Sequence, residues 1–190
     1  MSGNEKLLPD LRNYMTNIEF DVDDFFSRID FDAIEDSSNK IAECEYFLGL
    51  ASAEKDRTQF RWLISAFFGA AYSFFEMSAL RAYFAFTAPD TGDPIEDDEA
   101  LGILRNYVDV KLNKRKPFRV DTNGKHVVTK ELYEWRRENT HHFPLSIMAS
   151  GSSLPEDFQF GRMKGEGIPV LAFCRGAMLL IRQVQRELDA

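Results

Sequence analysis

Two arginines and two histidines lie close together in one short basic segment, at Arg136, Arg137, His141 and His142. The arginine guanidinium is a planar cation whose N–H edges match a phosphate group. Histidine titrates near neutral pH and can accept or donate a proton. RNA cleavage without a metal ion needs both groups: a base withdraws the 2′-hydroxyl proton, and a cation stabilises charge on the attacked phosphate. The open alternative is a basic cluster that only stabilises the negative end of a helix dipole.

Further basic and polar side chains near this segment are candidates for binding RNA. Lysine and arginine side chains can follow an RNA backbone, and short polar side chains can contact phosphate or cap a helix end. The candidates are Lys114, Arg115, Lys116, Arg119, Asn139 and Thr140. Tyr133 and Trp135 are candidates for stacking on bases, with packing in the core as the open alternative.

Charge is distributed unevenly along the chain. The 190 residues include 23 basic and 31 acidic side chains, for a net charge of −8. Spread evenly, that charge would repel nucleic acid. Residues 1–100 hold 8 of the basic and 21 of the acidic side chains, so residues 101–190 carry a net charge of +5. Only this second part is therefore a candidate for binding a phosphate backbone.

Cysteine number and spacing exclude a zinc site built on paired cysteines and a disulfide framework. Cys44 and Cys174 stand far apart in apolar segments, which indicates packed, reduced thiols and a cytoplasmic protein. The N-terminus lacks a basic stretch followed by an apolar run, so no secretory signal is expected. The longest apolar stretch, residues 62–75, is shorter than the about 20 residues that a membrane span needs. We expect no membrane association, no metal ion and no cofactor.

Hydrophobic spacing predicts an all-α domain over residues 37–190, a bundle of about five helices with a small β-hairpin. An acidic N-terminal extension, residues 1–36, precedes it. Helices are predicted from a Ser37 or Ser38 cap to residue 53, from an Asp56 or Thr58 cap to about residue 84, and at residues 94–116, 130–141 and 169–188. Asn123-Gly124 is a favoured type I′ turn, which predicts the hairpin at residues 117–129. Residues 150–167 are expected to be rich in loops.

The segment with the arginines and histidines resembles the motif of the HEPN superfamily, an Arg followed by four to six residues and then a His. Two overlapping pairs match with four intervening residues, Arg136 with His141 and Arg137 with His142. Further segments resemble small bacterial HEPN-like proteins in the same chain order. These are residues 45–49, 60–73, 141–145 and 167–181.

The resemblance implies a HEPN-like helical bundle that dimerises, so that two Arg/His motifs face one another across a cleft. Many HEPN-like proteins are metal-independent endoribonucleases of toxin–antitoxin, phage-defence or RNA-processing systems. The resemblance therefore implies a homodimer that acts on RNA, with an antitoxin or a nucleotidyltransferase as a further partner. Other HEPN-like proteins are inactive, so the alternative is a module that binds nucleotide, RNA or protein.

Which Arg/His pair would be catalytic is left open by the sequence. Arg136 with His141 is favoured, because the His-His-x-Pro ending then fits the resemblance best; Arg137 with His142 is a close second. Active HEPN-like proteins often have a small polar residue directly after the Arg, and neither pair has one. Five residues of a regular helix turn through about 500°, so neither pair would face one way. The motif therefore requires that the helix ends near it, as Pro144 favours, or that a partner subunit completes it.

Overall fold

A computed structural model describes the part of the chain that holds the predicted helices. All described residues belong to the second of the two units into which the chain divides, Met1–Glu35 and Asp36–Ala190. The predicted acidic N-terminal extension, residues 1–36, lies outside them. The described residues are 37–113, 120–141, 144–149, 154–161 and 167–190.

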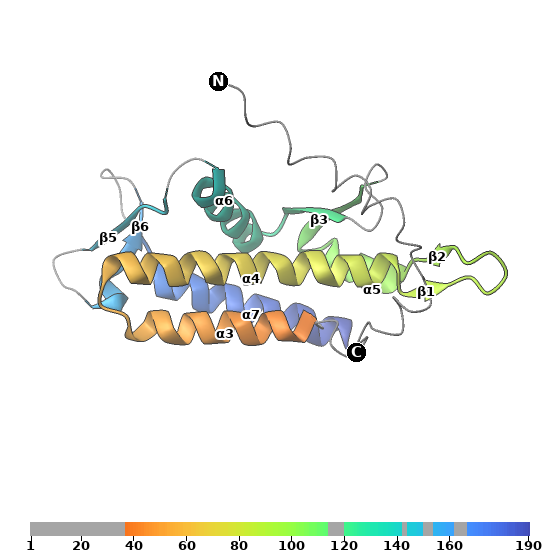
Figure 1. Cartoon of the computed structure of the whole chain (residues 1–190), viewed down its shortest axis with the longest axis horizontal. Helices are drawn as coiled ribbons and strands as arrows, with labels where there is room; N and C mark the ends of the chain where they lie inside the picture. The colour runs from red at the N-terminus through yellow and green to blue at the C-terminus, as the bar shows by residue number, and fades with distance from the viewer. Residues whose placement is uncertain (1–36, 114–119, 142–143, 150–153, 162–166) are drawn as a thin grey trace, which may run out of the picture. The chain divides into compact units, whose positions relative to one another are not determined.

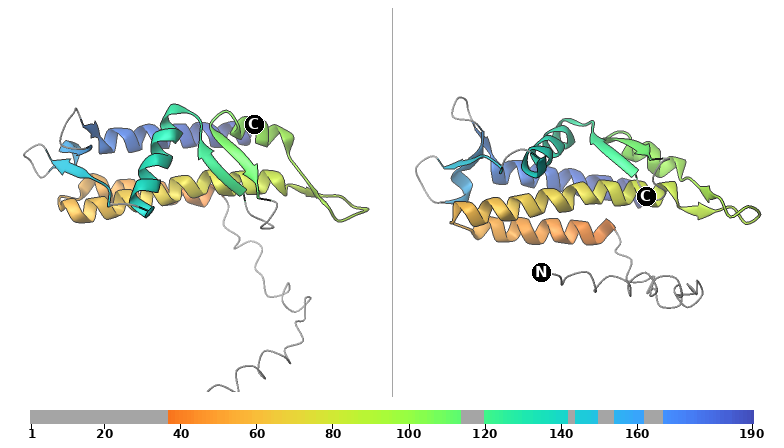
Figure 2. Two further views of the ribbon diagram at one scale, coloured as in Figure 1. Left: turned by 90° about the horizontal axis from the view of Figure 1, so that it is seen from above. Right: turned by 45° about the horizontal axis from the view of Figure 1, so that its top comes forward.

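Three long helices pack against one another and form the body of this unit (Figures 1 and 2). They are α3 (Ser37–Ala53), α4 (Arg57–Tyr83) and α7 (Val170–Leu188). All three are confirmed as helices, with ends within a few residues of those predicted. Asp56 caps α4, because its carboxylate accepts hydrogen bonds from the backbone N–H groups of Thr58 and Gln59, each at 2.9 Å.

Two shorter helices complete the helical part. Helix α5 (Asp98–Leu104) begins after Asp97, whose carboxylate accepts a hydrogen bond from the backbone N–H of Ala100. Helix α6 (Val127–His141) lies across α4 and also contacts α7 (Figure 2). Because α6 carries the predicted site arginines, its packing on α4 decides what surrounds them.

The predicted all-α fold class is wrong, because seven short strands in three small sheets accompany five α-helices in the described residues. Strands β1 (Phe86–Thr87) and β2 (Pro94–Ile95) pair with one another, as do β3 (Val108–Leu112) and β4 (Val120–Gly124). The third sheet is antiparallel and contains β5 (Ile147–Ala149), β6 (Phe158–Phe160) and β7 (Ile168–Pro169), with a 3-10 turn at Pro155–Asp157. The fold is therefore mixed α/β.

The hairpin lies earlier in the chain than predicted. Leu104, Val108 and Leu112 have helical spacing, but α5 ends at Leu104 and Val108 opens β3. Val108 and Val110 are buried while the residues between and after them are exposed, the alternation of a strand with one buried face. Asn123-Gly124 therefore forms the end of β4, opposite residues 108–109, and is not the hairpin turn.

Strand β6 (Phe158–Phe160) of the third sheet lies in the segment 150–167 that is predicted to be rich in loops. Phe158 and Phe160 are buried on either side of the half-buried Gln159. Each strand of this sheet has only two or three residues. Such short strands leave too few alternating positions to be distinguished from a loop in sequence.

Gly124 passes very close to the first turn of α6. A Cβ atom at this position would collide with the backbone of Thr129 and Lys130. We expect G124A to lower the free energy of unfolding by about 1–3 kcal/mol in urea denaturation. The control is G49A in α3, where a Cβ would meet nothing within 4 Å; it should leave stability unchanged or raise it by up to about 1 kcal/mol. Equal stability of G124A and wild type would contradict the close approach.

Helix α4 provides much of the core through its phenylalanines. Phe60, Phe67, Phe68, Phe74 and Phe75 are all fully buried. At 27 residues, α4 is longer than the apolar stretch that the sequence indicates. It is the one described helix whose length and composition would allow it to cross a membrane, and half of its most apolar 18-residue stretch is buried inside the protein. Cytoplasmic location remains a prediction.

Both cysteines are free and buried. Burial raises the pKa of the Cys44 thiol to about 12 and also raises that of Cys174. The folded protein therefore retains protons that the unfolded chain releases above about pH 8.5, so stability falls as pH rises. We expect a loss of up to about 1.4 kcal/mol per pH unit for each thiol above pH 8.5. The free energy of unfolding of the double variant C44A/C174A should fall less with rising pH than that of wild type. Equal slopes of this free energy against pH for the two proteins would contradict this account.

Candidate functional site

Helix α6 ends within the Arg/His motif. Arg136 and Arg137 lie in its last turns, and His141 is its final residue. This confirms the expectation that the helix ends near the motif. The other predicted site residues lie outside the described residues or, within α6, have side chains that are not described. Those outside are Lys114, Arg115, Lys116, Arg119 and His142; those with undescribed side chains are Asn139, Thr140 and His141.

A pocket of about 330 Å³ opens beside the two arginines, between α4, β4 and α6, and is called the motif pocket below. Lys130, Arg136 and Arg137 give it three cations, and Glu134 gives it one carboxylate. The excess of positive charge suits a phosphate group. The structure thus brings both predicted arginines to one pocket, although consecutive helix residues point about 100° apart.

Arg136 is held in place by an aromatic ring from α4. Its guanidinium carbon lies 3.6 Å from the centroid of the Tyr72 ring, a cation–π contact at short range. Tyr72 packs in turn against Tyr133 of α6, with ring centroids 4.7 Å apart. The Tyr133 hydroxyl and the Thr122 hydroxyl of β4 share a hydrogen bond of 2.7 Å. Three separate elements therefore fix the wall of the pocket that carries Arg136.

The two tyrosines are hydrogen-bonding groups and not bases at neutral pH. Burial raises the pKa of Tyr133. Burial also raises the pKa of Tyr72, and a hydrogen bond to the Glu76 carboxylate adds to the effect. Both hydroxyls therefore keep their protons at neutral pH and are not bases there.

Trp135 packs in the core and not toward the pocket. Its ring stacks on Phe160 of β6, with centroids 4.7 Å apart and planes inclined by 20°. This favours the core alternative for Trp135 over base stacking. Tyr133 differs, because it lines the motif pocket as well as packing on Tyr72. The stack on Phe160 anchors α6 directly beside Arg136.

Sequence reasoning did not identify Tyr72, Thr122 and Lys130 as site residues. Tyr72 lies in the apolar run of α4, where it looks like any other core aromatic. Thr122 was expected in a hairpin arm and Lys130 at the start of a helix. Tyr72 and Thr122 come near the arginines only because α6 packs on α4 and β4. Lys130, in contrast, lies about two helical turns before Arg137 on α6 itself. No local sequence signal marks the contacts of Tyr72 and Thr122. The seven-residue spacing of Lys130 and Arg137, however, could have identified Lys130.

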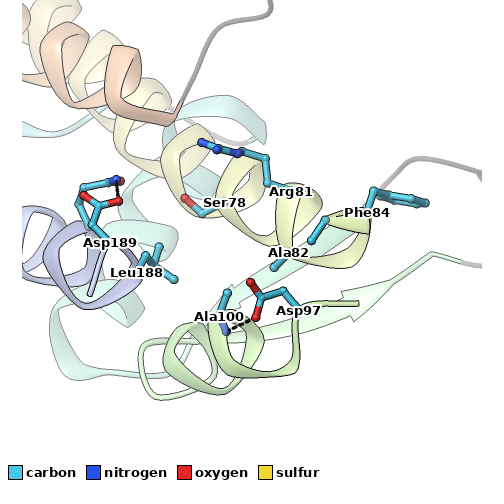
Figure 3. A pocket seen from close by; sticks show the side chains of 10 residues that line it. Ser78, Arg81, Ala82, Phe84, Asp97, Ala100, Leu188 and Asp189 are labelled. Carbon is cyan, nitrogen blue, oxygen red and sulfur yellow. Dashed lines mark hydrogen bonds between the residues drawn. The ribbon is translucent and has the colours of Figure 1, made fainter. Parts of the chain in front are cut away.

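A second pocket, of about 320 Å³, lies between the C-terminal ends of α4 and α7 and the start of α5 (Figure 3). Arg81, Asp97 and Asp189 line it with the buried Ser78, whose hydroxyl has no hydrogen-bond partner among the described residues. Two carboxylates beside one guanidinium do not favour phosphate. No predicted site residue lines this pocket, so the motif pocket is the better candidate.

The described residues contain no cluster of three or more His, Cys, Asp or Glu side chains that could hold a metal ion.

No protein-family model, no curated protein and no solved structure matches this chain.

Proposed function

We propose that this protein is a metal-independent endoribonuclease, with the motif pocket as its phosphate site. The observation that carries the proposal is the arrangement at the end of α6. Arg136, Arg137 and Lys130 line one pocket, and His141, where α6 ends, follows Arg137 by one helical turn. A cationic pocket beside a proton-transfer group is what attack by a 2′-hydroxyl requires.

Cleavage in this proposal proceeds by internal attack. His141 or His142 removes the proton of the 2′-hydroxyl, and the oxygen attacks the neighbouring phosphorus. The bond to the 5′-oxygen breaks, and that oxygen takes up a proton from a second acid. The products are a 2′,3′-cyclic phosphate and a 5′-hydroxyl. The guanidinium groups stabilise the additional negative charge on the phosphate oxygens as the new bond forms.

Different exposures of the two arginines support different roles. Arg136 is half-buried and lies on Tyr72, so its cation is already oriented before RNA binds. Arg137 is exposed and can reach a phosphate at the mouth of the pocket. The proposal retains Arg136 with His141 as the favoured pair and Arg137 with His142 as the second.

The partners in this proposal are those that the HEPN resemblance implies. A homodimer would bring two copies of the Arg/His motif to one cleft, which would supply the second acid that the leaving 5′-oxygen needs. An antitoxin or a nucleotidyltransferase would be the further partner in a toxin–antitoxin system.

The second candidate is an inactive module that binds RNA or nucleotide through the same pocket. One observation favours it: Tyr72, Tyr133 and Arg136, which form one wall of the pocket, are binding groups and not bases at neutral pH. Binding of RNA without cleavage by wild-type protein would favour this candidate over the enzyme.

The R136A/R137A variant is expected to lower kcat/KM for a single-stranded RNA oligonucleotide by at least about 10²-fold, since one lost donor to a developing anion costs that much. R136K/R137K should recover only part of the activity, because lysine keeps the charge but loses the planar fork. The matched control is R182A/R186A on α7, which removes the same charge away from the pocket. Equal losses in the control and in R136A/R137A would overturn the assignment of the motif pocket.

A further inference from the structure

A second basic pocket, of about 470 Å³, lies at the N-terminal end of α4 and is called the α4 pocket below. Arg57 and Arg61 line it together with residues 144–147, and no carboxylate does. Among the described residues, neither guanidinium forms a hydrogen bond or an ion pair with a side chain. The neighbouring Asp56 carboxylate is occupied by the backbone N–H groups that it caps. Two arginines one helical turn apart therefore line this pocket, and no carboxylate among the described residues lines it with them.

Chain connectivity places the α4 pocket beside the Arg/His motif. The chain leaves α6 at His141 and contributes Pro144 to the α4 pocket three residues later. Three steps between Cα atoms span at most about 11 Å. Figure 1 shows that β5 (Ile147–Ala149), which directly follows Ser146 of this pocket, lies at the end of α4 that joins α3. The backbone of His141 thus lies within about 11 Å of Pro144 in the α4 pocket and about one helical turn from Arg137 in the motif pocket.

Both pockets also open on one side of α4. Arg61 and Tyr72 are eleven residues apart on this helix, which is three turns to within about 20°. They therefore share a helix face, with a separation of about 16 Å along the axis. Tyr72 lines the motif pocket and Arg61 lines the α4 pocket. The two positive sites therefore lie along one face of α4.

We propose that Arg57 and Arg61 form a second phosphate subsite for the same RNA, about 16 Å along α4 from the motif pocket. This inference rests on the proposed function and adds the class of substrate. The substrate is a single strand of several nucleotides whose backbone enters both pockets, with the cleaved bond between them. A single strand can bend its phosphates into two recessed sites, whereas a duplex presents them on a stiff helix.

The experiment compares two RNA lengths. Equilibrium binding of wild-type protein, R57A/R61A, R136A/R137A and the control R182A/R186A is measured with a dinucleotide and an octanucleotide in EDTA. The 2′-hydroxyl at every cleavable position is methylated to prevent reaction. The dinucleotide is too short to reach both pockets, so R57A/R61A should bind it as wild type does. For the octanucleotide, we expect R57A/R61A to bind roughly tenfold more weakly. The slope of log affinity against log salt should also fall by about 1.4 for two lost phosphates.

The outcomes show whether the second subsite fails alone or together with the proposed function. If R136A/R137A weakens binding but R57A/R61A and R182A/R186A do not, the second subsite is refuted and the motif pocket stands. If R57A/R61A weakens both lengths equally, the α4 pocket is not a separate subsite and the inference is also refuted. If wild-type protein binds neither RNA, both proposals fail. Thermal unfolding of each variant shows whether a loss of binding comes from loss of fold.

Discussion

The double variant H141Q/H142Q is expected to lose RNA cleavage, with kcat/KM falling by about 10²–10⁴-fold, while RNA binding is kept. Glutamine can form hydrogen bonds but cannot accept and release a proton near neutral pH, which is the contribution assigned to these residues. The tyrosines of the motif pocket cannot replace them, because burial raises the pKa of both hydroxyls. Cleavage of a fluorescent oligonucleotide in EDTA gives the rate, and fluorescence anisotropy gives the affinity.

Single variants distinguish the two pairings. If Arg136 and His141 form the catalytic pair, H141Q should show almost the whole loss and H142Q little of it. The reverse result would assign the reaction to Arg137 and His142. The control is H126Q, because His126 lies at the start of α6, where its Nδ1 accepts a hydrogen bond from the backbone N–H of Val128 at 3.3 Å. Full activity in H141Q/H142Q would contradict the assigned chemistry.

The F160A variant is expected to show the largest loss of stability, about 3–5 kcal/mol. Phe160 of β6 is 1% exposed and contacts three rings from three helices. Its centroid lies 4.7 Å from that of Trp135 on α6, 5.8 Å from that of Phe68 on α4 and 6.1 Å from that of Phe173 on α7. Removal of the ring leaves a cavity where α6 is anchored to the body, beside Arg136.

Urea denaturation followed by tryptophan fluorescence measures this loss, since Trp135 reports directly on the cavity. F160L should recover most of the stability, because it restores much of the volume. F86A is the control, since Phe86 is 62% exposed and its removal should change stability by less than about 0.5 kcal/mol. A loss below about 1 kcal/mol in F160A would show that β6 does not anchor α6.

The long helices could be predicted because their signals are local. Apolar spacing marks α4 and α7, and Asp56 and Pro169 stand at their starts as expected. The strands could not be predicted in the same way. Val108 satisfies helical spacing with Leu104 and strand alternation with Val110, and only burial in the tertiary structure decides between them. Because the segment of β3 is predicted as helix, the hairpin turn is predicted wrongly at Asn123-Gly124, which lies at the end of β4.

The same distinction between local and tertiary features holds for the candidate site. Arg136 and Arg137 could be identified from sequence because the motif is short and continuous. Their environment could not, since Tyr72 lies 64 positions before Arg136 in the chain and reaches it only through the crossing of α6 over α4. Arg57 and Arg61 lie still further from the motif in sequence, and their pocket depends on where residues 144–147 return to α4.

The measurement that tests the central claim most directly is the chemistry of the RNA ends. Purified wild-type protein and the variant R136A/R137A/H141A/H142A are incubated with mixed RNA in EDTA, and the products are analysed by mass spectrometry. We predict that wild type alone cleaves and leaves 2′,3′-cyclic phosphate and 5′-hydroxyl ends. Equal cleavage by the quadruple variant, loss of wild-type cleavage in EDTA, or products with 3′-hydroxyl ends would contradict a metal-independent ribonuclease at this segment.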